Sequence, residues 1–273
     1  MLSIIVSSYQ EGYFNQFTNS VKEKIGNNFE YEIIQQWNPG KMGICEAYNK
    51  GAEKAQFENL LFVHEDIIFE TNNWGSILLE QLEIDNIGCI GLAGSSIKTK
   101  FPIGWWDITN RKFLHLNQHT VERGIEQYRE DNIKEVKILD GVFIAVKKNI
   151  WKANKFNQNN HSFHGYDLEF SLNISKNYKN FVFNEILVTH LSEGKLTKEW
   201  YLKLFNIYLD NKNYTVKPTL KEVKHFINYL NMFSFSVKEK LNMFFKFYNS
   251  MDFTFTNNLR ILKTIILSIK IKQ

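Results

Sequence analysis

The sequence predicts an α/β fold with a mixed, mainly parallel sheet flanked by helices, and three observations support this. Short runs rich in Ile, Leu and Val recur through the first two thirds of the chain, as in strands buried on both faces. Segments with apolar residues at helical spacing separate these runs. Polar and acidic residues directly follow several runs, at the sheet edge where open α/β folds bind ligands.

The first half of the chain alternates strand and helix patterns. Strands are predicted at residues 2–8, 31–34 and 59–63, with helices along Phe14 to Ile25 and Ile44 to Ala55. The second helix has a face of small residues, which permits close packing on a sheet.

Later strands and one more helix are less regularly spaced. The strands are predicted at 88–94, 136–139, 142–146 and 181–189, and a loop enters a helix at 163–174. Residues 108–135 are polar and weakly periodic, and we interpret them as a long irregular segment with a functional role.

The C-terminal part is predicted to be a helical extension, with the domain boundary after residue 214. Residues 219–222 and 236–239 have the pattern of capping boxes, each opening a helix with an apolar face that we expect to pack. A last helix is predicted over Leu259 to Lys272. It mixes apolar and basic residues, so packing and binding at a membrane interface both remain open.

Charge and composition exclude several classes of protein. Residues 215–273 contain ten Lys/Arg and three Asp/Glu, a net +7, so residues 1–214 carry −3 of the overall +4. A mildly acidic body with a basic tail is not a general nucleic-acid binder, and the tail suggests an anionic surface such as lipid. Cys45 and Cys89 exclude a disulfide scaffold. No signal peptide or span of ~20 apolar residues is visible, so we expect a cytoplasmic protein, peripheral on the inner membrane face through its basic helices.

The most informative feature is His64-Glu65-Asp66, which follows the apolar strand 59–63. Carboxylates at the end of a buried strand are costly to desolvate unless a cation or hydrogen bonds compensate them. The sequence therefore predicts a divalent-cation site here, with an ordinary acidic loop as the alternative.

The succession of motifs resembles the glycosyltransferases of the GT-A fold, specifically the inverting family 2-like group. The matching segments are residues 4–9, 43–51, 61–66, 140–141, 165–169 and 190–194. The resemblance spans roughly residues 1–200 and implies a Rossmann-like nucleotide-diphospho-sugar transferase fold for the predicted catalytic domain, residues 1–214. It also implies a hexosyltransferase-type enzyme that moves a sugar, expected to come from a UDP-sugar, to a saccharide or lipid-linked glycan in bacterial surface polysaccharide synthesis.

The resemblance also assigns the metal site. Asp66 corresponds to the carboxylate ligand of Mn²⁺ or Mg²⁺, and His190 to the distant histidine that completes the site, which favours manganese. His64 departs from the acidic residue usual at its position. It could bind the metal, but we expect it rather to hydrogen-bond the nucleotide or a neighbour. The residues expected to contact the nucleotide are Ser7, Ser8, Tyr9, Lys41, Gly43, Asn49, His64 and Glu65.

An inverting transfer needs a base for the acceptor hydroxyl. Asp167 is the expected base and Glu169 the reserve, while Tyr166 replaces the Glu usual in this motif. A helix N-cap is the structural alternative for Asp167. The residues expected to contact the acceptor are Trp105, Trp106, Asp140 and Gly141, the tryptophans by stacking on sugar rings.

Three other functions were weighed. A catalytically inactive GT-A-like nucleotide or glycan binder is supported by the departures at His64 and Tyr166. A nucleotidyltransferase would normally have a Gly-rich loop after the first strand, and this chain has Ser7-Ser8-Tyr9 there. A membrane-surface adaptor built on the basic helices would leave the acidic residues without a role. The oligomeric state stays open.

Overall fold

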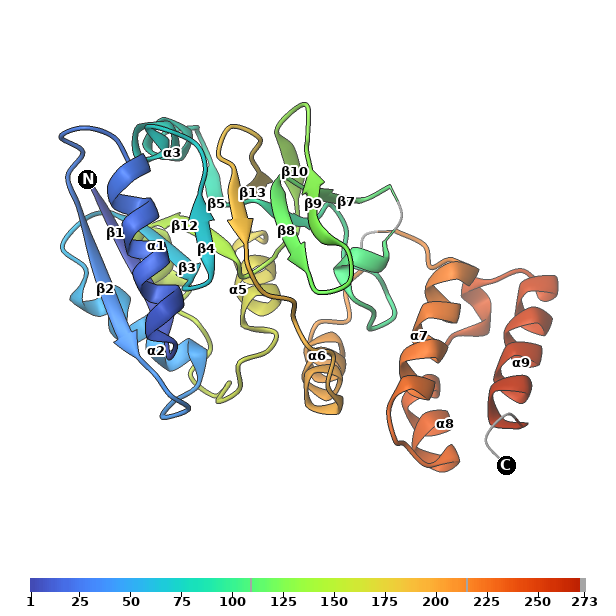
Figure 1. The fold of residues 1–273 in the computed structure, drawn as a ribbon. Coiled ribbons are helices and arrows are strands. Elements are labelled where there is room, and N and C mark those ends of the chain that lie inside the picture. The colour runs from blue at the N-terminus through green and yellow to red at the C-terminus, as the bar shows by residue number, and fades with distance from the viewer. Residues whose placement is uncertain (109, 215, 271–273) are drawn as a thin grey trace. The chain divides into compact units, whose positions relative to one another are not determined.

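A computed structural model describes residues 1–108, 110–214 and 216–270 of the chain (Figure 1). The chain forms two compact units, one of residues 1–96 and 111–194 and the other of residues 97–110 and 195–273. The residues between 195 and the predicted boundary at 214 thus group with the C-terminal helices.

The first unit is built on a seven-stranded sheet. The strands lie in the order β10 (Lys134–Val136), β13 (Lys179–Val182), β5 (Ile87–Gly91), β12 (Phe143–Lys147), β3 (Asn59–His64), β1 (Leu2–Ser8) and β2 (Tyr31–Trp37). Pairing is parallel for β2–β1, β1–β3 and β5–β13, while β10 and β12 run antiparallel to their neighbours. The predicted mixed, mainly parallel sheet is confirmed.

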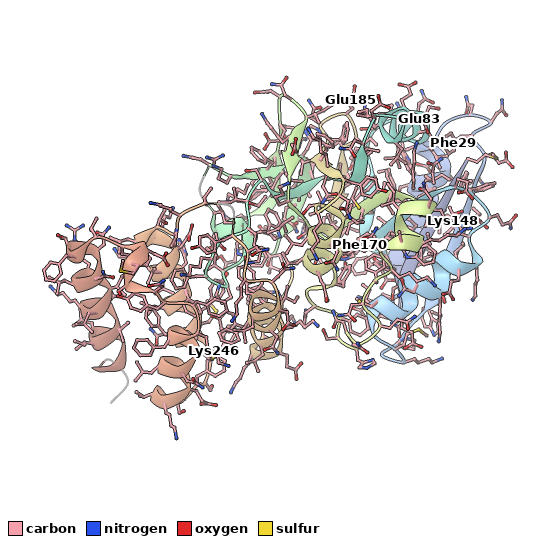
Figure 2. The ribbon with its side chains drawn as sticks, turned by 180° about the vertical axis from the view of Figure 1, so that it is seen from behind. Phe29, Glu83, Lys148, Phe170, Glu185 and Lys246 are labelled. Carbon is pink, nitrogen blue, oxygen red and sulfur yellow. The ribbon has the colours of Figure 1, made fainter. Side chains whose placement is uncertain are left out.

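Helices cover both faces of this sheet. One face packs against α2 (Ile44–Lys54), α4 (Lys148–Ala153) and α5 (Tyr166–Ile174), and the other against α1 (Glu11–Lys24) and α3 (Trp74–Leu82). Phe170 of α5, labelled in Figure 2, lies in the first of these layers, and its ring stacks on that of Phe156 with centroids 4.0 Å apart. A Cβ on Gly51 would lie 2.3 Å from Ile5 Cγ2, so the small face of α2 does permit close packing.

Two small sheets complete the first unit, and they correct part of the sequence analysis. One contains β4 (Ile67–Phe69), β14 (Val188–His190), β8 (Leu116–Thr120) and β9 (Gly124–Tyr128), and the other β11 (Ile138–Leu139), β6 (Ala93–Ser95) and β7 (Lys112–Leu114). The interpretation of residues 108–135 as irregular was wrong, because they form β7 to β10. The β8–β9 hairpin is largely polar, and its outer strand β9 is a mostly exposed sheet edge, so no apolar alternation marks the hairpin.

The second unit is helical. It contains α6 (Lys198–Asp210), α7 (Leu220–Met232), α8 (Val237–Phe245), α9 (Phe255–Lys270) and two short 3₁₀ helices, η1 (Trp105–Asp107) and η2 (Ser250–Asp252). The capping box of Ser236 and Glu239 is complete. Thr219 is the N-cap of α7, and its hydroxyl accepts a hydrogen bond from Glu222 N. The last helix begins earlier than predicted, and Lys272 lies outside the described residues. Among the described helices, none has the length and apolarity that a membrane span requires.

Candidate active site

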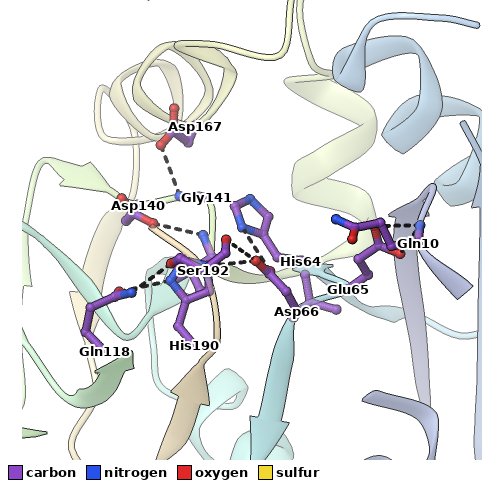
Figure 3. Close-up of polar contacts among 12 residues, drawn as sticks. Gln10, His64, Glu65, Asp66, Gln118, Asp140, Gly141, Asp167, His190 and Ser192 are labelled. Atoms are coloured by element: carbon purple, nitrogen blue, oxygen red, sulfur yellow. Dashed lines mark hydrogen bonds and ion pairs between the residues drawn. The ribbon is translucent and has the colours of Figure 1, made fainter. Parts of the chain in front are cut away.

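The turn between β3 and β4 carries the acidic residues, and Asp66 lies at its centre. Its Oδ2 atom accepts a hydrogen bond from the Ser192 hydroxyl and lies 3.4 Å from His190 Nε2, while Oδ1 lies 3.8 Å from His64 Nδ1 (Figure 3). Antiparallel pairing of β14 with β4 places His190 opposite Ile67, next to Asp66 in the chain. Strand register therefore brings together two residues that lie more than 120 positions apart.

The second nitrogen of each histidine has a fixed partner. His64 Nε2 lies 2.8 Å from the Tyr166 hydroxyl, and His190 Nδ1 lies 3.0 Å from Gln118 Oε1. Because the Gln118 oxygen can only accept, His190 Nδ1 carries the proton and Nε2 presents its lone pair. This Nε2 atom is buried and has no hydrogen-bond partner among the described residues.

The charges in this cluster favour an ionised carboxylate. Burial raises the pKa of Asp66, but the nearby imidazoles of His190 and His64 and the hydrogen bond from Ser192 outweigh it, so the pKa lies well below its ordinary value. Burial lowers the pKa of His64. Burial also acts to lower the pKa of His190, but Asp66 reverses this and leaves it raised.

These residues fit a divalent metal ion. His64, Asp66 and His190 each offer one ligand atom, and the three atoms lie within 4.8 Å of one another. Two ligands on one ion with bonds of about 2.0–2.2 Å lie roughly 3–4.4 Å apart, so the 3.4 and 3.8 Å separations already match. The buried, unpartnered Nε2 of His190 is the atom that a cation would satisfy. Imidazole ligands favour manganese over magnesium.

Two further carboxylates, Asp140 and Asp167, lie beside this cluster. Gly141 N donates to Asp167 Oδ2 at 3.0 Å, and Val142 N donates to Asp140 Oδ1 at 3.0 Å. Burial and the charge of Asp140 raise the pKa of Asp167 to about 7. Asp140 also acts electrostatically on His190 and His64, so this pair lies close to the Asp66 cluster. A carboxylate with a pKa near neutrality is suited to accept a proton.

The expected acceptor turn is held closely against α5. A Cβ on Gly141 would lie 1.9 Å from the Tyr166 hydroxyl, so only glycine leaves room for that group. Asp167 lies in the first turn of α5, where the N-cap residue is Gly165 and offers no side chain. Glu169 instead binds Asn157, whose Nδ2 lies 2.6 Å from Oε1. The structure therefore brings Asp167 to the site and engages Glu169 with the loop before α5.

Glu65 contacts backbone rather than its neighbours in the turn. Its carboxylate accepts hydrogen bonds from Tyr9 N at 3.1 Å and Gln10 N at 3.2 Å. Gln10 is the N-cap of α1, so Glu65 binds the two backbone N–H groups that lie just before the helix begins. Burial raises the pKa of Glu65, although the backbone hydrogen bonds oppose it. Glu65 thus fixes the loop in which the nucleotide is expected to bind.

The other expected nucleotide residues divide by accessibility. Tyr9 and Lys41 are exposed and Ser7 is half-buried. The buried Ser8 hydroxyl accepts from Gln35. Gly43 is the N-cap of α2, where a Cβ would lie 2.7 Å from the backbone of His161.

Asn49 is fully engaged within the protein. Its amide donates to Phe156 O at 2.8 Å, and its oxygen accepts from Phe156 N at 3.1 Å and from the Trp151 indole at 3.2 Å. The nucleotide contact expected of this buried residue stays a prediction, and the structure gives it a structural role.

Trp105 and Trp106 belong to the second unit. Trp106 stacks on Trp200 with ring centroids 5.5 Å apart, and Trp105 meets it edge-on at 5.8 Å. Sugar stacking on either indole stays a prediction.

Sequence reasoning missed three supporting residues. Gln118 lies in the polar segment 108–135, where no local pattern predicts its position opposite His190 on β8. Ser192 belongs to the quoted 190–194 motif, and a hydroxyl two residues after the histidine was an available signal. Tyr166 was noted only as a departure from the family pattern.

Comparison with known proteins identifies the family. The model of the glycosyltransferase-like family matches residues 3–222. A search of curated proteins found no match.

Solved structures share the fold. GalNAc-T7 with UDP, GalNAc and Mn²⁺ superposes with a TM-score of 0.54 at 10% identity, covering 89% of this chain and 53% of that one. TarS of S. aureus superposes with a TM-score of 0.55 at 14% identity, and the match covers 98% of this chain and 54% of TarS. Its fragment 1–349 in complex with UDP-GlcNAc gives 0.51 at 14% identity, covering 98% and 81%. This chain spans about half the length of the first two structures. Since the family match covers most of the sequence and the fold agrees, this chain belongs to the glycosyltransferase-like family and has the GT-A fold.

Proposed function

We propose that this protein transfers a sugar from a UDP-sugar to a saccharide or lipid-linked glycan, with inversion and with a divalent metal ion. One observation carries the proposal: the metal-ligand residues around Asp66 and a carboxylate of near-neutral pKa, Asp167, lie in one site. Structural neighbours in complex with UDP-GlcNAc, and with UDP, GalNAc and Mn²⁺, support the choice of donor and metal.

The roles of the residues follow from their positions. Asp66 and His190 would hold the ion, which supplies positive charge against the leaving diphosphate. Asp167 takes the proton of the acceptor hydroxyl as that oxygen bonds the anomeric carbon. The bond from this carbon to the diphosphate breaks, and its electron pair leaves with the diphosphate. The backbone of Gly141, which donates to Asp167, orients the base.

The experiment is a calorimetric titration of UDP into the protein, first with Mn²⁺ and then with EDTA. Binding that requires the metal supports the proposal, and a screen of UDP-sugars for hydrolysis and transfer then follows. If neither UDP nor GDP, CDP or dTDP binds, the proposal fails.

A non-catalytic nucleotide or glycan binder is the alternative favoured by one observation, the phenol of Tyr166 in place of a carboxylate. It predicts binding of UDP with no turnover of any UDP-sugar. Retention of Asp167 beside Asp66 and His190 argues for catalysis, because a binder has no need for a base.

We further propose a cytoplasmic enzyme of bacterial surface polysaccharide synthesis that docks on an anionic membrane face. Support comes from α9, where Phe255, Leu259, Leu262 and Ile266 form one stripe that is 46–78% exposed. The basic residues Arg260 and Lys263 are exposed on the same helix. Sedimentation with vesicles containing phosphatidylglycerol, and loss of sedimentation in the double variant Leu259→Glu, Leu262→Glu, would support docking. Equal sedimentation of the variant would refute it.

A further inference from the structure

Two positions at which this chain departs from the acidic pattern of its family contact each other. His64 ends β3, Tyr166 begins α5, and their side chains meet at 2.8 Å although 102 positions separate them. Their direct contact indicates that they act as a pair.

The Tyr166 hydroxyl is held in place from several sides. The residue is 5% exposed, and its ring packs edge-on against Tyr48 at 5.6 Å and against Phe156 at 6.1 Å. The space for the hydroxyl exists because Gly141 has no side chain. The hydroxyl therefore has little freedom to move, while His64 is 32% exposed and depends on it for its orientation.

This contact determines which nitrogen of His64 faces the metal-ligand residues. With Nε2 bonded to the phenol, Nδ1 is directed at Asp66, 3.8 Å from Oδ1. His190 is arranged in the same way, with Nδ1 bonded to Gln118 and Nε2 directed at Asp66. Histidine ligands commonly have their second nitrogen fixed by such a partner.

We propose that His64 is a third metal ligand, through Nδ1, and that Tyr166 is the positioning residue that holds this imidazole toward Asp66 and His190. The inference rests on the metal dependence of the proposed function and adds to it. A centre of two imidazoles and one carboxylate binds Mn²⁺, Co²⁺ or Zn²⁺ in preference to Mg²⁺. With only one negative ligand, it also leaves net positive charge on the ion for a diphosphate.

The test measures Mn²⁺ affinity of the full chain by electron paramagnetic resonance of free Mn²⁺, with and without UDP. The variants are Tyr166→Phe, which keeps the ring, His64→Ala, and their combination. Tyr208→Phe is the matched control, because it removes another buried phenol, one that bonds Thr99 in the second unit. Thermal unfolding of each metal-free variant establishes that it is folded.

We expect Tyr166→Phe to weaken Mn²⁺ binding about 10–100-fold, as loss of an outer hydrogen bond to a ligand does. His64→Ala should weaken it at least as much, and the double variant should match His64→Ala, since Tyr166 acts only through His64. The visible spectrum of bound Co²⁺ should change in His64→Ala and stay unchanged in Tyr208→Phe. If Tyr166 had a purely structural role, the losses of Mn²⁺ affinity in Tyr166→Phe and His64→Ala would add in the double variant. The visible spectrum of bound Co²⁺ in Tyr166→Phe would then match that of wild type.

A second pair of variants keeps the test sharp if Tyr166→Phe does not fold. In His64→Asn the side-chain amide lies where Nδ1 of the histidine was, and in His64→Gln it lies where Nε2 was. Because Nδ1 is the proposed ligand atom, His64→Asn should bind Mn²⁺ more tightly than His64→Gln. Wild-type affinity in both His64→Ala and His64→Gln would overturn the inference and leave the proposed function standing. If the wild-type protein binds no Mn²⁺ with or without UDP, both are overturned.

Discussion

Replacement of Asp167 by asparagine should stabilise the protein at alkaline pH and stop sugar transfer. Burial and the charge of Asp140 hold the pKa of Asp167 at about 7, against an ordinary value of 3.8. Between these two values the folded protein binds a proton that the unfolded chain releases. The contribution of the protonated carboxyl to stability is therefore complete below about pH 4 and is lost as pH rises through about 7.

The size of the effect follows from the two pKa values. Their difference corresponds to a change of ~4 kcal/mol at most in the free energy of unfolding. We expect a change of about 1–2 kcal/mol, because the half-buried side chain of Asp167 remains partly hydrated. Asparagine cannot ionise, yet its oxygen can still accept the hydrogen bond from Gly141 N. Relative to wild type, the variant should therefore gain stability between pH 5 and pH 8.

Urea denaturation at the two pH values, with EDTA present, measures this gain. Asp131→Asn, at an exposed position, controls for the loss of one negative charge. In parallel, Asp167→Asn should bind UDP with Mn²⁺ as wild type does and show no transfer. A stability difference that stays constant from pH 5 to pH 8 would refute the electrostatic reasoning, and normal turnover would refute the assignment of the base.

Three further substitutions test the site. Asp66→Asn should abolish Mn²⁺-dependent UDP binding in calorimetry, and retained binding would exclude Asp66 as a ligand. Gly141→Ala should cost about 2 kcal/mol or more in urea denaturation, because its Cβ would overlap the Tyr166 hydroxyl, while Gly12→Ala has open space and should not destabilise. Asn49→Ala should cost about 2–3 kcal/mol through its three buried hydrogen bonds, with UDP affinity unchanged. A loss of UDP affinity without loss of stability would instead make Asn49 a nucleotide contact.

Much of the first unit was predictable because its strands are buried and apolar. The runs at 2–8 and 59–63 became β1 and β3 with ends within one residue of the prediction. The runs at 88–94 and 181–189 were each predicted as one strand. Both divide between two sheets, and an apolar run carries no mark of the point at which a chain leaves one sheet for another.

The site was predictable where a residue's neighbours in the chain decide its environment. Asp66 follows a buried strand, and its position at the sheet edge came from that alone. The partners of His64 and His190 depend on contacts made far along the chain, with Tyr166 and Gln118 respectively. Pairing of this kind comes from the register of β14 on β8 and from the placement of α5, which no local pattern encodes.

The turn after β3 directs three successive side chains to three different parts of the first unit. His64 reaches α5, Glu65 reaches the start of α1, and Asp66 reaches the end of β14. One short turn thus contacts α5, the start of α1 and the end of β14 through three consecutive side chains. Inserting or deleting one residue in this turn would redirect all three side chains at once. The spacing of the turn should therefore tolerate far less change than the identity of its individual residues.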